Sequence, residues 1–219
     1  MTTAIFDYLE MMVVFSPCAH QGCDRYALGR TQFCLRHQPD FNTAIPEVLQ
    51  HLQSQQNLVG WNFSELTFSD LVFSEKYVAS CLFSHGVFPS IGFRKCRFEN
   101  CFFDFSLFSD CSWHECVLHN CTFAGSEFSS SRFEESTLFQ VSFNGITARN
   151  INFSSSDLFR SLFIGSSLHG ALFEDCNLKR VNFCRSERQN VQFKWSNEME
   201  AIFSEDQSSR QRIYPLERF

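Results

Sequence analysis

Residues 93–123 read FRKCRFENCFFDFSLFSDCSWHECVLHNCTF, and every fifth residue of this stretch, beginning with Phe93, is large and apolar. The same register begins at Phe63 and continues without an insertion to Phe183, where 17 of the 25 positions are Phe and only Ala148 is not a large apolar residue. A period of five fits neither an amphipathic helix nor a half-buried strand, whose apolar residues recur about every 3.6 and every 2 positions. It suits a chain that turns a corner after every five residues.

A second periodic position lies two residues before each large one, and most of its occupants are small or β-branched. Cysteine is frequent there, as at Cys81, Cys96, Cys101, Cys111, Cys116, Cys121 and Cys176. One large and one small inward side chain per side would fill a narrow tube, and four sides would make a coil of about 20 residues. Because hydrogen-bonded strands lie about 4.8 Å apart, the rings of successive coils would stack within the favourable range of roughly 4.5–7 Å.

The five-residue pattern resembles that of the pentapeptide-repeat family, and the resemblance covers about 130 of the 219 residues. It implies an all-β solenoid, a right-handed quadrilateral β-helix of about seven coils, each burying its apolar face against its neighbours. The sequence offers a check on the four sides, because residues 20 apart should share one side. Four of the five central Leu residues have this spacing: Leu118, Leu138, Leu158 and Leu178. The register breaks at Arg188 and returns at Phe193.

The segment before the repeats carries two close pairs of potential metal ligands, with ten residues between the pairs. Two short pairs that grip one ion from two sides are typical of a structural Zn²⁺ site, which takes four nitrogen or sulfur ligands. The stretch resembles a short Cys3His zinc-finger module. The predicted ligands of a structural zinc ion are Cys18, Cys23, Cys34 and His37. His20 is the alternative fourth ligand, and ordinary unligated Cys and His residues are the alternative interpretation.

Helices are predicted at both ends of the solenoid. Asn42–Gln56 has one apolar stripe, and Thr43 is placed to cap its start. This helix would cover the strand edges and the Phe core of the first coil, which need a cap. A short second helix, begun by Ser196 and ending near Phe203, would cap the other end.

These features divide the chain into three predicted parts. Residues 1–57 form a zinc-binding-like module with the capping helix, residues 58–195 form the β-helix, and residues 196–219 form a C-terminal cap and tail. The segment Met1–Phe15 is expected to pack on the zinc module or over the first coil.

Composition argues against several classes of protein. The net charge is −6, and the coils at 61–193 carry 14 acidic against 11 basic residues, so direct nucleic-acid binding is not expected. The sequence shows no secretory signal, so export is not expected. It also contains no apolar stretch of about 18 residues, so a membrane span is not expected. Most of the 11 Cys residues fall at inward positions, where a thiol behaves as a small apolar group. We therefore expect reduced thiols and a cytoplasmic protein.

The repeats also present apolar residues at positions that should point outward. The predicted partner-binding residues are Leu82, Phe102 and Phe105 in a first patch, and Phe139, Phe159, Leu162 and Ile164 in a second. Exposed apolar patches usually mark contact surfaces. The N-terminal module is an alternative cover for the first patch, so the second is the better candidate for a protein partner or for self-association as a homodimer.

A non-enzymatic protein–protein interaction scaffold is the predicted function. No Gly-rich phosphate loop or nucleophile elbow is present, and a convex tube offers few concave sites for chemistry. The resemblance implies an alternative, because some pentapeptide-repeat proteins bind bacterial DNA gyrase by mimicking duplex DNA. Such mimicry needs dense negative charge, and three net negative charges over about 30 Å of solenoid are far sparser than in DNA. The second alternative is an enzyme or nucleotide binder that uses the N-terminal module and would need an open zinc position.

Overall fold

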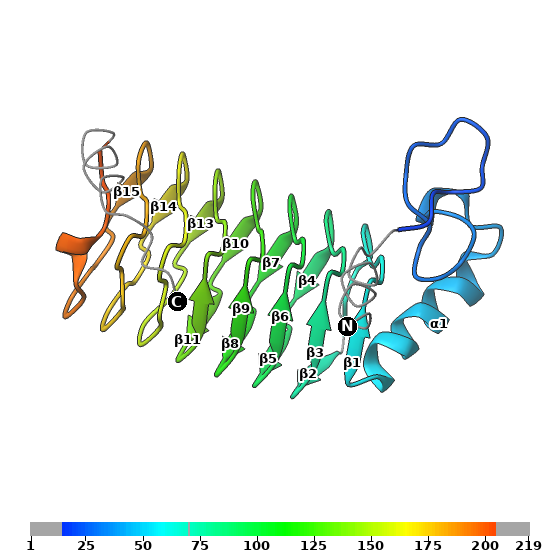
Figure 1. Cartoon of the computed structure of the whole chain (residues 1–219), viewed down its shortest axis with the longest axis horizontal. Helices are drawn as coiled ribbons and strands as arrows, with labels where there is room; N and C mark the ends of the chain where they lie inside the picture. Colours follow the sequence, from blue (N-terminus) through cyan, green and yellow to red (C-terminus); the bar gives the residue numbers. More distant parts are fainter. Residues whose placement is uncertain (1–14, 70, 205–219) are drawn as a thin grey trace, which may run out of the picture.

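The computed structural model describes residues 15–69 and 71–204 and shows a parallel β-solenoid with a small Cys- and His-containing module and one α-helix at its N-terminal end (Figure 1). The helical elements are η1 (Leu35–His37), α1 (Phe41–Ser54) and η2 (Glu198–Glu200). The strands are β1 (Asn57–Val59), β2 (Val72–Ser74), β3 (Tyr77–Ala79), β4 (Val87–Pro89), β5 (Gly92–Arg94), β6 (Arg97–Glu99), β7 (Leu107–Ser109), β8 (Ser112–His114), β9 (Val117–His119), β10 (Glu127–Ser129), β11 (Arg132–Glu134), β12 (Thr137–Phe139), β13 (Thr147–Arg149), β14 (Ser167–His169) and β15 (Glu187–Gln189).

Residues 20 apart pair with each other along the whole solenoid. Three parallel sheets form three sides of the solenoid. Their strand orders are β1-β3-β6-β9-β12, β15-β14-β13-β10-β7-β4 and β11-β8-β5-β2. A ladder of single parallel bridges from Asn62↔Leu82 to Asn182↔Ile202 forms the fourth. The four sides and the coil repeat predicted from the sequence are therefore confirmed, with about seven turns. The right-handed winding implied by the family remains a prediction.

Each corner is made by a residue with left-handed backbone. In the described coils, every residue with positive φ has a number divisible by five and lies two places after the central residue of a repeat. Most of these corner residues are not Gly, although the left-handed region costs an ordinary side chain free energy. Gly125 is required by space as well, because a Cβ there would lie 2.6 Å from the ring of Phe105 one coil earlier.

The core is dominated by columns of stacked aromatic rings. One side contributes an unbroken column of eight Phe residues, with centroids 4.7–5.3 Å apart: Phe63, Phe83, Phe103, Phe123, Phe143, Phe163, Phe183 and Phe203. The facing side contributes a second column, in which Trp113 lies between Phe93 and Phe133. In the later coils the two columns meet edge to face, as in the pair Phe153–Phe163 at 5.4 Å and 86°.

The predicted Leu column is also confirmed, since strand and bridge pairing places Leu118, Leu138, Leu158 and Leu178 on one side. The Cys residues at inward coil positions are buried and free, as predicted. Among the buried side-chain nitrogen and oxygen atoms of the described residues, only the indole N–H of Trp113 has no hydrogen-bond partner.

Helix α1 covers the first coil, as the sequence predicts, and buries Val48 and Leu52 against it. It begins at Phe41 rather than Asn42, and its N-cap is Asp40 rather than Thr43. The Asp40 carboxylate accepts hydrogen bonds from the Asn42 amide at 3.0 Å and from the Thr43 hydroxyl at 2.6 Å. A carboxylate also interacts favourably with the positive end of the helix dipole, which explains why Asp40 takes the position.

Lys76 joins the helix to the coils and was missed from the sequence. Most repeats have a small residue at the inward position that Lys76 occupies. The long Lys76 side chain is nevertheless buried there and is only 4% exposed. Its ammonium donates to the carbonyls of Gln53 at 2.9 Å and Gln55 at 2.6 Å, at the C-terminal end of α1. The last carbonyls of a helix lack partners within the helix and attract a cation. Burial lowers the pKa of Lys76.

The predicted C-terminal helix is reduced to the single 3-10 turn η2. Met199, which lies within this turn, is 92% exposed. The coil instead continues, because Phe203 is the next ring of the column after Phe183 and stacks on it at 5.3 Å. Ile202 also pairs with Asn182. Burial of the Phe203 ring in the column favours another stretch of coil over a helix.

The stack ends against cationic groups. The guanidinium of Arg188, at the central position where the register breaks, lies 5.0 Å from the ring of Phe203 and donates to the Phe183 carbonyl at 3.0 Å. At the other end, Trp61 stacks on Phe63 at 5.7 Å, and Arg30 lies 5.0 Å over the Trp61 ring. The predictions for the segment 1–14 and for the tail after 204 fall outside the described residues.

Replacing a ring in the middle of the column should unfold the protein more easily. We expect Phe123→Ala to lower the free energy of unfolding by about 3–5 kcal/mol, because the ring is fully buried between Phe103 and Phe143 and leaves a cavity. Phe102→Ala, one coil earlier and partly exposed, should change it by about 1 kcal/mol or less. Urea titration measures both, and equal losses would contradict the stacked core.

Removing the ammonium of Lys76 should loosen the N-terminal cap. We expect Lys76→Met to cost about 1–3 kcal/mol, because two carbonyls at the end of α1 lose their donor. Lys95→Met is the control, since Lys95 makes only an exposed ion pair with Glu115 at 3.4 Å. Hydrogen exchange of the α1 amides should accelerate in the first variant alone.

Candidate metal centre and interaction surface

The four predicted metal ligands come from two loops that the backbone holds together. The Cys18 amide donates to the Arg25 carbonyl at 2.8 Å and closes the first loop around Cys23. The second loop carries Cys34 at the start of η1 and His37 at its end, and the His37 amide donates to the Cys34 carbonyl at 3.0 Å. Each loop therefore presents a pair of ligand side chains toward the other.

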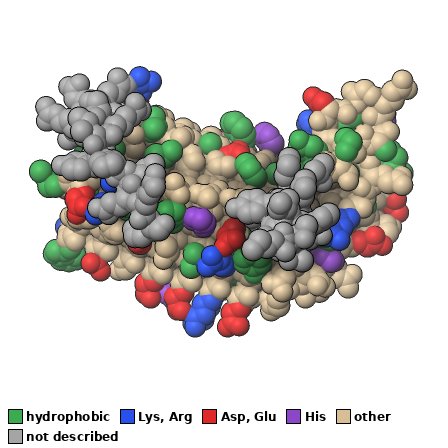
Figure 2. All heavy atoms as spheres, in the orientation of Figure 1, with side chains coloured by type: hydrophobic (Ala, Val, Ile, Leu, Met, Phe, Trp, Pro, Cys, Tyr) green, Lys and Arg blue, Asp and Glu red, His purple; other side chains and the backbone are tan. Residues whose placement is uncertain are grey.

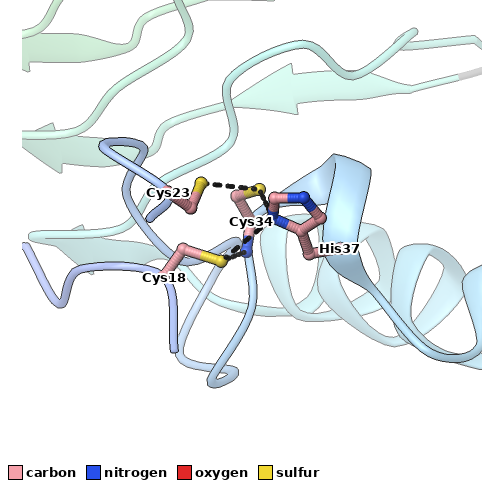
Figure 3. Close-up of side chains that lie close together, drawn as sticks. All are labelled: Cys18, Cys23, Cys34 and His37. Carbon is pink, nitrogen blue, oxygen red and sulfur yellow. Dashed lines mark hydrogen bonds between the residues drawn. The ribbon is translucent and has the colours of Figure 1, made fainter. Parts of the chain in front are cut away.

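The ligand atoms converge on one point. All four lie within 4.8 Å of one another, and Figure 3 shows their side chains turned inward from the two loops. The Nδ1 atom of His37 is 3.5 Å from Cys18 Sγ and 3.4 Å from Cys34 Sγ, and Cys23 Sγ is 3.9 Å from Cys34 Sγ. A tetrahedral Zn²⁺ with Zn–S bonds of about 2.3 Å and Zn–N bonds of about 2.0 Å requires S–S edges of about 3.8 Å and S–N edges of about 3.5 Å. The three measured distances are close to the edges that one tetrahedral ion would need, so the group could hold a metal ion.

His37, and not His20, belongs to this group within the described part of the chain. The His20 ring stacks on the ring of His37, with centroids 3.8 Å apart and an angle of 11° between the planes. The sequence left the two histidines open as alternatives. The structure separates their positions, because η1 turns His37 toward the sulfur atoms.

The pKa values of the Cys18 and Cys23 thiols shift in opposite directions. Burial opposes ionisation of Cys18, but hydrogen bonds from the Cys34 and His20 backbone and from the His37 ring outweigh it and lower the pKa of Cys18 to about 6. At Cys23 a hydrogen bond from the Arg25 backbone favours the thiolate, yet burial and the neighbouring sulfur atoms together raise its pKa. A bound cation would relieve this repulsion, because thiolates are the form that binds metal.

A second group of potential ligands, His114, Glu115 and Glu135, lies on the coil surface. Glu115 already interacts with the ammonium of Lys95 at 3.4 Å and with His114 at 3.1 Å. The neighbouring cysteines are separate from this group, because Cys111 and Cys116 are buried in the tube. Cys111, His114, Cys116, His119 and Cys121 are close together in the sequence, but among the described residues they do not form one metal-binding group.

The first predicted patch is exposed and borders a cleft. Phe102 is 42% and Phe105 is 60% exposed, while Leu82 is half-buried. The cleft has a volume of about 740 Å³ and lies between the N-terminal module and the first three coils. Tyr26 of the module lines one wall, and Leu82 and Phe102 line the other. The module therefore forms one wall of the cleft and does not cover Phe105.

The patch continues around the corner of the solenoid. The Phe105 ring stacks on His85 at 5.4 Å, and the exposed residues Val87 and Leu107 pair on the adjoining side. We call the set Leu82, Val87, Phe102, Phe105 and Leu107 the apolar corner. Val87 and Leu107 carry a signal in the sequence, since both are apolar residues at outward positions 20 apart.

The second predicted patch is less exposed. Phe139, Phe159, Leu162 and Ile164 are all half-buried. The Phe139 ring lies between His119 at 4.9 Å and Phe159 at 5.7 Å, and the Arg160 guanidinium covers Phe159 at 5.2 Å. These side chains cover one another, so less apolar surface remains here than at the apolar corner.

Charge is mixed over the visible surface. Acidic and basic side chains are interspersed on the face shown in Figure 2, and no continuous basic stripe crosses it. Among the described residues, no helix has both the length and the apolar content needed to cross a bilayer.

Comparison with known proteins identifies the repeat. The family model described as Pentapeptide repeat region matches residues 91–173 and 116–193. Residues 91–193 of this chain are a pentapeptide repeat region. The resemblance seen in the sequence is thereby confirmed, whereas the Cys/His module lies outside the residues that the family model matches.

Three solved structures are similar to the chain at low identity. HetL from the cyanobacterium Nostoc sp. Strain PCC 7120, a pentapeptide repeat protein involved in heterocyst differentiation regulation, is 12% identical over 72% of this chain and 96% of its own, with a TM-score of 0.41. Trypsin-treated QnrB1, a plasmid-mediated fluoroquinolone resistance protein, is 18% identical over 73% and 97%, with a TM-score of 0.40. The pentapeptide repeat protein Rfr23 from the cyanobacterium Cyanothece 51142 is 10% identical over 73% and 99%, with a TM-score of 0.30. A search of curated proteins found no match.

The ligand group should hold one metal ion per chain. We expect Cys34→Ser and His37→Ala to lose the ion, because each removes one corner of the tetrahedron. His20→Ala should keep it, since that ring only stacks on His37. Elemental analysis of the dialysed proteins measures the metal content, and equal loss in all three variants would contradict the assignment.

Proposed function

We propose that this pentapeptide repeat protein is a non-enzymatic scaffold that binds a partner protein through the apolar corner and the adjoining cleft. The observation that carries the proposal is the exposure of Phe102 and Phe105 beside a concave surface. Large aromatic side chains at the surface are costly to keep in water and typically become the buried anchors of an interface. The cleft adds the concavity that a plain tube lacks.

The chemistry of the coil thiols supports a non-enzymatic role. Burial raises the pKa of Cys111 and of Cys176 to about 11. A hydrogen bond from Cys116 lowers the pKa of Cys96 to about 7, but the Cys96 side chain is enclosed in the tube. A catalytic thiol needs both a thiolate and access to its substrate, and none of these three combines them.

We further propose that the ion in the N-terminal module is a structural zinc. The donor set of three sulfur atoms and one imidazole nitrogen is typical of closed zinc sites, in which no position remains for a substrate. The zinc would fix two loops that have few buried apolar residues of their own. The zinc would in this way hold the wall of the cleft in place. A catalytic zinc needs a coordination position that is open to substrate, whereas here protein ligands would take all four.

The DNA-mimic alternative has less support. A mimic of duplex DNA would need a charge density near one negative charge per roughly 1.7 Å of axis. On the visible face, by contrast, acidic and basic side chains are interspersed (Figure 2). Self-association as a homodimer is compatible with the scaffold proposal, and light scattering of the purified chain would determine it.

A pair of matched variants tests which surface binds the partner. We expect Phe105→Glu to abolish capture of the partner, because a buried unpaired carboxylate in the interface costs several kcal/mol. Phe159→Glu, in the second patch, should leave capture unchanged. Quantitative mass spectrometry of proteins retained from a lysate of the source organism provides the measurement. If Phe105→Glu still captured the partner and Phe159→Glu did not, the second patch would be the binding surface instead.

A further inference from the structure

Two loops carry the predicted metal ligands, residues 18–25 and residues 34–37, and we call them the metal loops. Ion pairs join them to the first full coil. Arg25 lies two residues after the ligand Cys23, and Arg36 lies two residues after the ligand Cys34. Both guanidinium groups reach Glu65: Arg25 pairs with Oε1, and Arg36 Nε lies 3.4 Å from Oε2. One carboxylate of the solenoid thus bridges two loops that each carry a pair of metal ligands.

The arginines are tied closely to the ligand group. The Arg25 carbonyl accepts the hydrogen bond from the Cys18 amide at 2.8 Å. Arg36 lies within η1, between the ligands Cys34 and His37. A change in the position of either ligand pair must therefore move the guanidinium beside it. Glu65 itself is fixed in the coil by its left-handed backbone and by its amide, which donates to the Ser84 carbonyl at 2.9 Å.

A second contact beside Glu65 orders the wall of the cleft. The buried Asn62 side-chain amide donates to the carbonyls of Tyr26 at 3.2 Å and Ala27 at 2.9 Å, and the Gly29 amide donates to the Asn62 carbonyl at 2.6 Å. The backbone that carries Tyr26 thus lies between the metal loops and the coil. Arg25, Tyr26, Arg36, Asn62 and Glu65 all line the cleft.

We propose that metal binding in the N-terminal module and partner binding in the cleft are coupled through Glu65, which acts as the positioning residue between them. Metal binding sets the two loops, the loops place Arg25 and Arg36 on Glu65, and this contact holds the Tyr26 wall at its distance from Phe102. Coupling between two sites is reciprocal. The docked solenoid therefore strengthens metal binding, and a partner that bridges Tyr26 and Phe102 strengthens it further. The partner half of this inference rests on the proposed function, whereas the metal half does not.

The metal half can be tested with Zn²⁺ alone on the full chain. Glu65→Gln removes the charge that bridges the loops and leaves all four ligands in place. We expect it to weaken Zn²⁺ binding at least about fivefold, the lower end of typical coupling between sites, in competition with a chromophoric chelator. The urea midpoint of the coils should not change, because Glu65 lies at an outward corner.

Glu75→Gln is the matched control. Glu75 occupies the next corner but one, has the same left-handed backbone, and forms no ion pair within residues 15–69 and 71–204. It should bind Zn²⁺ as the wild type does. Arg36→Gln and the double variant with Glu65→Gln complete a double-mutant cycle, in which the losses should not add if the two groups act together.

The outcomes separate this inference from the proposed function. Unchanged Zn²⁺ affinity in Glu65→Gln, or equal weakening in Glu75→Gln, would overturn the coupling. Fully additive losses in the cycle would overturn the role of the Arg36–Glu65 contact. If Glu65→Gln does not fold, Arg36→Gln provides the same test from the module side, since Arg36 is largely exposed. None of these measurements uses a partner, so the coupling can hold even if the scaffold proposal fails.

Discussion

The fold depends on the match between two spacings, that of hydrogen-bonded strands and that of stacked aromatic rings. Strand pairing brings residues 20 apart to about 4.8 Å, and the eight Phe rings of the continuous column lie 4.7–5.3 Å apart. Flat rings can therefore repeat from coil to coil, and the larger ring of Trp113 also stacks between Phe93 and Phe133. The second inward position, two residues before each ring, is most often Cys or Ser, whose small side chains fit between the columns.

A stack of finite length must also end, and both ends of this one use cations. Lys76 takes an inward position near the start and points its ammonium at the free carbonyls of α1. Arg188 takes a central position near the finish and covers the ring of Phe203. In a repeat protein each unit is stabilised by its neighbours, so the terminal units need other partners. A charged residue at an inward position of the pattern is thus an indication that the solenoid is near its end.

The interior of the tube is filled by buried side chains, so its outer surface is what other molecules can contact, and the corner backbone and the N-terminal module shape that surface together. The left-handed corner residues point away from the core, which places Phe105 in solvent and Glu65 within reach of two arginines. The module adds a wall opposite Phe102, and the result is a cleft on a fold that would otherwise be convex. In the coupling that we propose, a metal ion held beside the solenoid end would influence a surface that contains no ligand of its own.

The sequence by itself determined the five-residue register, because a strict period leaves few arrangements that bury every large side chain, and it grouped Cys18, Cys23 and Cys34. The four sides were implied by the resemblance to the pentapeptide-repeat family, and the residues 20 apart supported them. It also indicated both apolar patches from residues 20 apart. Only the tertiary structure decided between His20 and His37, since both lie near the cysteines in sequence and the turn of η1 selects one. It alone showed that residues 196–203 continue the coil and that Arg25, Arg36 and Glu65 meet. These outcomes depend on contacts between segments far apart in the chain, which local spacing does not encode.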